Sequence, residues 1–333
     1  MRLTVFQPLG YTALFGERPR KPLRGAVPKR LLKIAALGLA ILPLLGFPGC
    51  RVKTRQQLPP EKVLPLQTAT LEELLGRLRR QAEAVHSINA VAELEPSTGS
   101  AYSGVIEEYH DVRAFVLAQQ QAAGAAGNGP GRQIRMIGQA PVVRKNVFDM
   151  VADDETFQIF LPTKNKFIVG PTRLERRSQK PIENLRPQHL FEALFLDAPF
   201  SDTPHLLEEN EFGGQRYYAV SEITLGDHDE LELHRKWWFD RTDLSLVRVQ
   251  RFDLGGVLVA DIHYGQWREE NGVSFPHEIE LVRPQDDYRL KLLIKQVRLN
   301  EPLAAEKFKL ERPPGVEAVE LKAETDKPPQ EPR

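Results

Sequence analysis

The sequence has a single cysteine, a formal net charge of zero and few long apolar runs. Cys50 is the single cysteine among 333 residues, so no disulfide can form within the chain and the fold depends on its hydrophobic core. Lys plus Arg and Asp plus Glu number 45 each, a balance that argues against a nucleic-acid-binding protein. An apolar content of 41 % supports a packed core and argues against a disordered chain.

Signatures of catalysis and of metal binding are missing as well. The sequence has no Gly-x-Ser-x-Gly motif, and the glycine-rich residues 124–131 lack the Lys-Ser/Thr step of a phosphate-binding loop. The histidines fit no closed zinc pattern, and the acidic turn at Asp227–Glu230 lacks the alternating ligands of a calcium loop. We therefore expect no metal, no cofactor and no enzymatic activity.

The apolar run that approaches the length of a membrane span ends immediately before Cys50. Lys29 and Arg30 precede this run, LLKIAALGLAILPLLGFPG, and together they form the basic and apolar parts of a secretory signal. A cysteine directly after the cleavage point indicates a bacterial lipoprotein, in which the thiol carries a diacylglyceryl group. The box Phe47-Pro48-Gly49-Cys50 departs from the common Leu-Ala-Gly-Cys form. The alternative is a transmembrane helix, but the run falls at the short end of about 20 residues and contains prolines.

Four segments follow from this pattern. Residues 1–49 are expected to be an N-terminal extension and signal peptide, and Met1–Ala26 lacks any helical or strand period, which suggests a translation start near Val27. Residues 50–69 are expected to form a lipidated tether, and residues 70–312 a folded domain. The polar, proline-rich residues 313–333 are expected to be a disordered tail.

Two helices are predicted. Thr70 can cap a helix with Glu73 three residues later, and an apolar stripe at helical spacing follows it. Val85 and Ile88 can extend that stripe. The second helix is predicted over Pro187–Leu196, where apolar residues pair at i, i+4.

Most of the remaining chain alternates apolar and polar residues in short stretches bounded by turn residues. Asn271-Gly272 predicts a tight hairpin, Lys164-Asn165 another tip, and a change of period near Gln296 predicts a bulge. Short turns make successive strands antiparallel neighbours. The expected strands are Tyr102–Leu117, Gln133–Ile137, Val142–Val151, Thr156–Leu161, Lys166–Val169, Glu230–Phe239, Leu246–Phe252, Val257–Trp267, Val273–Val282 and Tyr288–Ile294.

Ten or more antiparallel strands with two helices predict a mainly β (α+β) fold. A flat sheet of that size would leave an apolar face uncovered, so we expect a curved antiparallel sheet that forms an incomplete barrel with a few covering helices. Alternation along two strands predicts one apolar inner face, which either lines a ligand cavity or packs as core. Its members are Leu231, Leu233, Trp237, Phe239, Tyr288, Leu290, Leu292 and Ile294.

The order of these features resembles the LolA/LolB-like superfamily of bacterial lipoprotein carriers and sorting proteins. The resemblance spans roughly residues 70–312 and is carried by WWFDRTDLSLVRVQRFDLGGVLVADIHYGQWREENGVSFPHEIEL and KLLIKQVRLNEPLAAEKFKL, with a further likeness over IRMIGQAPVVRKNVFDMVADDETFQIFLPTKNKFIVG. Positions that match the family's turn and strand steps are Tyr264, Gly272, Pro276, Asn300, Pro302 and Phe308. The chain is longer than the family's small receptors.

The resemblance implies a half-barrel with a helical lid over an apolar cavity that receives acyl chains. We therefore expect a non-catalytic, lipid-anchored cell-envelope protein that binds the acyl chains of lipoproteins or lipids. Its expected place is the periplasmic face of the outer membrane, because Arg51 rather than Asp follows Cys50. The alternative is a structural or assembly lipoprotein that binds envelope protein partners through a filled barrel.

Overall fold

The computed structural model describes residues 65–100, 105–108, 112–120, 131–140, 144–172, 186–226 and 230–321. These residues all belong to one unit of the chain, Val63–Arg333. The expected signal peptide, Cys50, most of the tether and residues 322–333 lie outside the described part. No helix within that part has both the length and the apolar character needed to cross a membrane.

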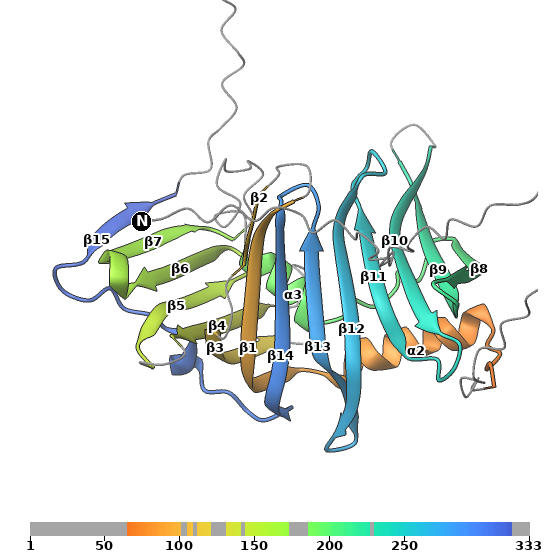
Figure 1. Ribbon diagram of the computed structural model, residues 1–333, viewed down its shortest axis with the longest axis horizontal. Coiled ribbons are helices and arrows are strands. Elements are labelled where there is room, and N and C mark those ends of the chain that lie inside the picture. Colours follow the sequence, from red (N-terminus) through yellow and green to blue (C-terminus); the bar gives the residue numbers. More distant parts are fainter. Residues whose placement is uncertain are drawn as a thin grey trace, which may run out of the picture. The chain divides into compact units, whose positions relative to one another are not determined.

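One sheet of 15 strands accounts for most of the described chain (Figure 1). Every strand pair is antiparallel except β15 with β7. The strands are β1 (Ser87–Ser100), β2 (Val105–Glu108), β3 (Val112–Gln120), β4 (Arg132–Gln139), β5 (Asn146–Asp153), β6 (Thr156–Leu161), β7 (Lys166–Pro171), β8 (His205–Phe212), β9 (Gln215–Leu225), β10 (Leu231–Asp240), β11 (Leu246–Phe252), β12 (Leu258–Glu270), β13 (Val273–Arg283), β14 (Tyr288–Leu299) and β15 (Glu317–Glu320). The helices are α2 (Leu71–Ala84), α3 (Pro187–Leu194) and the short 3-10 turns η2 (Pro162–Lys164) and η4 (Ala305–Phe308).

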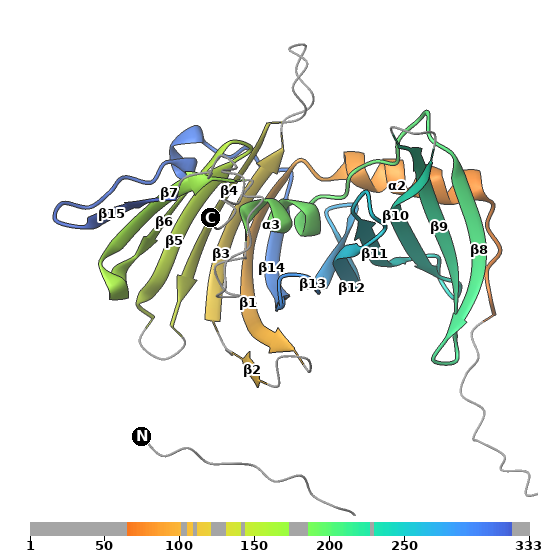
Figure 2. The same cartoon turned by 90° about the horizontal axis from the view of Figure 1, so that it is seen from above.

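The sheet is curved and does not close. Its strand order is β15-β7-β6-β5-β4-β3-β1-β14-β13-β12-β11-β10-β9-β8, with β2 attached to β1, so β15 and β8 are the two ends. Figure 2 shows the two wings of the sheet bending toward the same side, with α3 between them. The predicted fold class, a curved antiparallel sheet with a few covering helices, is confirmed.

Side-chain hydrogen bonds cap both ends of helix α2. The Thr70 hydroxyl accepts a hydrogen bond from the Glu73 amide at 3.3 Å, and the Glu73 carboxylate accepts one from the Thr70 amide at 2.7 Å, which confirms the predicted capping box. At the other end, Asn300 Nδ2 donates to the Ala84 carbonyl at 2.8 Å. The helix packs its leucine stripe against the inner face of the sheet.

Local turn chemistry fixes the register of the second half. Asn271 and Gly272 have φ of 53° and 82°, the left-handed values that a two-residue hairpin requires, and they join β12 to β13 as predicted. The bulge predicted near Gln296 is confirmed, because Val91 pairs with Gln296 while Ala92 pairs with Ile294. Lys295 is the extra residue, and the inward positions change from Ile294 to Val297.

Three expectations are corrected by the structure. The helix does not continue through Val85 and Ile88: it ends at Ala84, and Ile88 lies in β1, which pairs with β3 on one side and β14 on the other. Strands β1, β8 and β9 were not among the expected strands. The tail expected from residue 313 includes β15, where Glu317–Glu320 pairs in parallel with β7, so the folded domain continues beyond residue 312.

Candidate functional site

Six of the eight residues predicted for the inner face come together on the concave side. Trp237 is 1 % exposed and Leu292 is 0 % exposed, and all six belong to one hydrophobic cluster with α2 and α3. Leu292 lies directly between Ile279 of β13 and Leu94 of β1. The six are Trp237, Phe239, Tyr288, Leu290, Leu292 and Ile294. We call this set the inner wall.

The other two predicted residues do not share that face. In β10, Leu233 pairs with Ile223 while Arg235 pairs with Glu222, so a bulge at His234 reverses the side on which the preceding residues lie. Leu231 is 71 % exposed and Leu233 is only partly buried. The prediction of one common face was therefore wrong for Leu231 and Leu233.

Helix α3 covers the inner wall. Its Pro187 occupies the first turn, where the missing amide proton costs nothing, and six of its eight residues are buried. The Tyr264 hydroxyl donates to the Ala193 carbonyl at 3.2 Å, and the Tyr288 hydroxyl is hydrogen-bonded to His189 Nδ1. The inner wall is thus closed by a helix that contacts it through both apolar and polar groups.

Burial keeps these polar groups neutral. Desolvation, with the nearby arginines, holds the pKa of His189 well below its usual 6.5. Desolvation also raises the pKa of Tyr264 and of Tyr288 above the usual 10.0. The contact between α3 and the wall is therefore made by an uncharged imidazole and protonated phenols.

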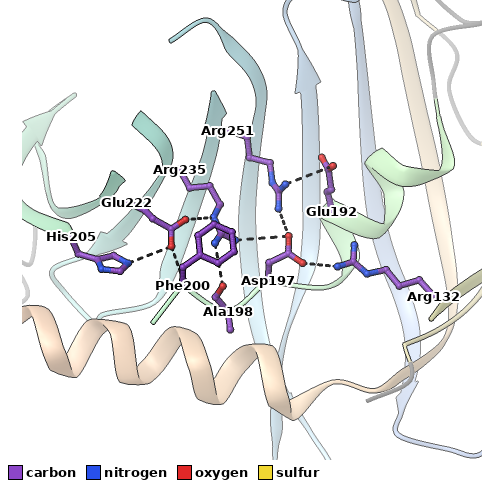
Figure 3. A network of polar contacts seen from close by, with 9 residues as sticks. All are labelled: Arg132, Glu192, Asp197, Ala198, Phe200, His205, Glu222, Arg235 and Arg251. Atoms are coloured by element: carbon purple, nitrogen blue, oxygen red, sulfur yellow. Dashed lines mark hydrogen bonds and ion pairs between the residues drawn. The ribbon is translucent and has the colours of Figure 1, made fainter. Parts of the chain in front are cut away.

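A charged network lies beside α3 on the same concave face (Figure 3). Asp197, just after α3, forms ion pairs with arginines from three strands: Arg132 at 2.7 Å, Arg235 at 3.9 Å and Arg251. Arg251 also contacts Glu192 of α3 at 3.7 Å. Five strands separate β4, which carries Arg132, from β11, which carries Arg251, so the curvature of the sheet brings both to one carboxylate. We call Arg132, Arg235 and Arg251 the arginine cluster.

The charges of the arginine cluster determine the ionisation of Asp197. Burial alone would raise the pKa of this carboxyl, but the charges of Arg251, Arg132 and Arg235 outweigh burial and lower the pKa below its usual 3.8. Asp197 is therefore an anion at neutral pH. Its side chain is 27 % exposed, so water reaches the carboxylate.

The deepest part of the network is the pair Arg235–Glu222. Arg235 Nε donates to Glu222 Oε2 at 2.7 Å, and the two side chains are 3 % and 0 % exposed. The Phe200 amide donates to Glu222 Oε1 at 2.7 Å, and the Arg235 guanidinium lies over the Phe200 ring, 4.7 Å from its centroid. His205 Nε2 approaches the same carboxylate at 3.4 Å. A fully buried carboxylate is thus satisfied by an arginine and a backbone amide.

No protein-family model matches the chain, and the comparison with curated proteins gives no match. Solved structures match at low identity. A DUF1329 family protein from Desulfovibrio piger ATCC 29098 has a TM-score of 0.48 at 13 % identity, covering 71 % of this chain and 94 % of that chain. A LolA superfamily protein from Nitrosomonas europaea has a TM-score of 0.45 at 11 % identity, covering 73 % and 99 %. A Vibrio parahaemolyticus domain described as an outer membrane lipoprotein-sorting protein has a TM-score of 0.44 at 13 % identity, covering 71 % and 94 %.

Two of these structures carry names from the superfamily that the sequence resembles. At such identities and with TM-scores below 0.5, the likeness extends neither to a site nor to a function.

Reasoning from the sequence missed the arginine cluster. A signal was present, because Arg235 lies two residues before Trp237 and Arg251 two residues after Val249, at positions where the alternation calls for apolar side chains. A charged side chain at an inward-facing strand position departs from the apolar pattern, and it must be paired with an opposite charge or hydrogen-bonded there. Asp197 gave no such signal, since it lies in a loop without periodicity.

A surface hollow and a metal site are the other kinds of candidate site to compare with the concave face. A hollow of about 430 Å³ lies on the opposite, outer face of the sheet, and its lining includes Glu93, Arg113 and Lys295 but no inner-wall residue. Among the residues that the structure describes, no group of three or more His, Cys, Asp or Glu is arranged to hold a metal ion. Cys50, the predicted lipidation site, lies outside them.

Proposed function

We propose that this chain is a lipid-anchored protein of the bacterial cell envelope whose concave face binds the acyl chains of lipoproteins or lipids, without catalysing a reaction. Anchoring would use Cys50, and the expected place is the periplasmic face of the outer membrane, where such a protein would serve lipoprotein sorting or membrane assembly. One observation carries the proposal: a continuous apolar wall in an unclosed sheet of 15 strands is covered only by α2 and by α3, a helix of eight residues, among the described helices.

The energetics suit an acyl chain. Each buried methylene contributes about 0.8 kcal/mol, so a long chain needs no specific polar contacts to be held. Displacing α3 would uncover the part of the hydrophobic cluster that lies on the strands it contacts, β4, β12, β13 and β14. The helix is bound to this wall through few polar contacts, which an opening motion can break together.

One rim of the sheet carries exposed aliphatic residues. The hairpins β9–β10 and β11–β12 turn at the same edge, because their strands are antiparallel neighbours. At these turns Leu225, Leu231 and Leu254 are each more than 60 % exposed, and Val257 is also exposed. An apolar rim next to the mouth of the concave face favours transfer at a membrane surface.

The second candidate function is an assembly protein with a filled barrel. The burial of every inner-wall residue favours it, because in this conformation α2 and α3 already occupy the space that a cargo would need. The two functions differ in whether α3 leaves the wall.

A photoactivatable acyl probe distinguishes them. Incubated with the full chain and irradiated, a palmitate analogue carrying a diazirine near its chain end should bind in a saturable way and crosslink to β10, β13 and β14. Leu206→Ala on β8, an exposed position, is the control and should crosslink as the wild type does. Labelling that does not saturate, or that maps only to exposed surfaces, would establish the filled barrel.

The anchor is tested separately. Cys50→Ser should abolish incorporation of a clickable palmitate analogue in cells and leave the protein soluble or uncleaved. A variant that is cleaved and still fractionates with membranes would refute lipidation at Cys50.

A further inference from the structure

The arginine cluster has a geometry that an internal ion pair alone does not require. Arg235 and Arg251 lie directly opposite each other on β10 and β11. Like charges directly opposite on neighbouring strands are destabilising unless an anion lies between them. Asp197, in the segment after α3, is the anion that both arginines share, while Glu222 also pairs with Arg235 and Glu192 with Arg251.

All three arginines project from the concave face. Arg132 lies two residues from buried Ile134, and Arg235 and Arg251 lie two residues from buried Trp237 and Val249. Residues two apart on a strand share a face. The cluster therefore borders the inner wall directly, with cationic groups beside apolar ones.

One member of the cluster lies near the apolar rim. Arg251 is the penultimate residue of β11, one position before the strand ends at Phe252 and the chain turns toward exposed Leu254. The side chains of Arg132 and Arg251 are each 20 % exposed, whereas Arg235 is nearly buried. An anion that enters from solvent would therefore meet Arg132 and Arg251 first, while its apolar part points toward Trp237.

We propose that the arginine cluster is the headgroup site for an anionic amphiphile, a molecule with one acyl chain and a carboxylate or phosphate, and that Asp197 occupies this site in the closed state. This inference rests on the proposed acyl-chain function and adds to it the charge of the ligand. Planar guanidinium groups bind carboxylate and phosphate oxygens through paired hydrogen bonds, so the cluster suits both headgroups. The ligand would exchange its anion for that of Asp197, and its chain would take the place of α3 against the inner wall.

Three probes of equal chain length test the inference on the full chain: palmitate, palmitoyl lysophosphatidic acid and neutral monopalmitoylglycerol. Affinities are measured by displacement of the photoactivatable acyl probe below the critical micelle concentration of each. We expect at least one anionic probe to bind about tenfold more tightly than the neutral one, and added salt to reduce that preference. The stronger of the two identifies carboxylate or phosphate as the headgroup.

Two substitutions separate headgroup binding from simple opening of the lid. Asp197→Asn removes the competing anion, so affinity for the anionic probes should rise about tenfold while affinity for the neutral probe stays within about twofold. Arg132→Gln should lower anionic affinity selectively, and Arg132→Lys should retain part of it. The matched control is Asp261→Asn, an aspartate that pairs with Arg248 at 2.7 Å on the outer face, and it should change neither.

The outcomes are distinct. If Asp197→Asn raises the affinity for all three probes equally, Asp197 only holds α3 in place and the headgroup inference is refuted. If the wild type binds the neutral probe as well as the anionic ones, the inference fails while acyl binding stands. If no probe binds to the wild type or to Asp197→Asn, both the proposed function and this inference fall. The wild-type selectivity decides the question even if a variant does not fold.

Discussion

Removing Arg235 should strongly destabilise the domain. Arg235→Met keeps most of the side-chain volume but leaves the Glu222 carboxylate, which is 0 % exposed, without its guanidinium. Breaking one partner of a buried ion pair costs about 3–5 kcal/mol. Glu222 still accepts the Phe200 amide, so we expect a value near the lower limit, about 3 kcal/mol. At roughly 2–4 °C per kcal/mol for a domain of this size, the Tm should fall by about 6–12 °C.

Urea unfolding followed by tryptophan fluorescence measures this change. Arg235 lies over the Trp237 ring, 5.0 Å from its centroid, so the signal reports on the site itself. The control is Arg289→Met, which breaks an exposed pair with Glu280 at 3.0 Å and should cost at most about 1 kcal/mol. The double variant Glu222→Gln/Arg235→Met should regain more than about 1 kcal/mol, because no unpaired charge remains buried. If Arg235→Met costs no more than Arg289→Met, Arg235 and Glu222 do not form a buried ion pair.

Three further changes test other parts of the fold. Because burial and nearby arginines hold the pKa of His189 below 6.5, the unfolded chain binds a proton below that pH that the folded chain does not. The free energy of unfolding should therefore fall as the pH drops below about 6.5, by up to about 1.4 kcal/mol per pH unit. Urea titrations from pH 7.5 to 5.5 measure this fall, which should be smaller in His189→Gln. A pH dependence that is the same in the variant as in the wild type contradicts the assignment to His189. The Asn300 side chain makes hydrogen bonds to three backbone groups at the end of α2 and just after it, and its own backbone has a left-handed φ of 60°. Asn300→Ala should therefore lower the free energy of unfolding, measured by thermal unfolding, by about 2–4 kcal/mol, more than Asn300→Asp does. Thr70→Ala should cost about 1 kcal/mol in the same measurement and Thr70→Ser almost nothing; equal losses would argue against the capping box.

The sequence predicted the second half of the sheet well because its information is local. Asn271-Gly272 determines one hairpin by backbone conformation alone, and the bulge at Lys295 shows in the sequence as a change of apolar parity from Ile294 to Val297. Strand β1 was harder. Val85 and Ile88 continue a helical spacing, and only pairing with β3 and β14, remote in sequence, makes Ser87–Ser100 a strand.

The bulge in β10 left no comparable trace. Leu231, Leu233, Trp237 and Phe239 all occupy odd positions, so their pattern is unbroken although the chain reverses its faces at His234. Of these four residues, Trp237 and Phe239 after the bulge face the core, and Leu231 and Leu233 before it do not. The structure therefore confirms that Trp237 and Phe239 share the inner face. That this face lines a ligand cavity stays a prediction.

The arginine cluster is difficult to explain by stability. Well-packed apolar residues in place of a buried ion pair are often neutral or stabilising, because desolvation of the charges offsets their attraction. Aliphatic side chains at positions 235 and 251 would extend the inner wall to the mouth of the sheet and would remove the repulsion between Arg235 and Arg251. The chain instead places cations there. Arg235 is neutralised by buried Glu222 on the neighbouring strand β9, whereas Arg251 and Arg132 pair with Asp197, a partly exposed carboxylate on a loop. A counter-ion on a loop next to a short helix can be displaced by an anion from solvent, whereas one on a neighbouring strand cannot, and that difference favours a binding role over a purely structural one.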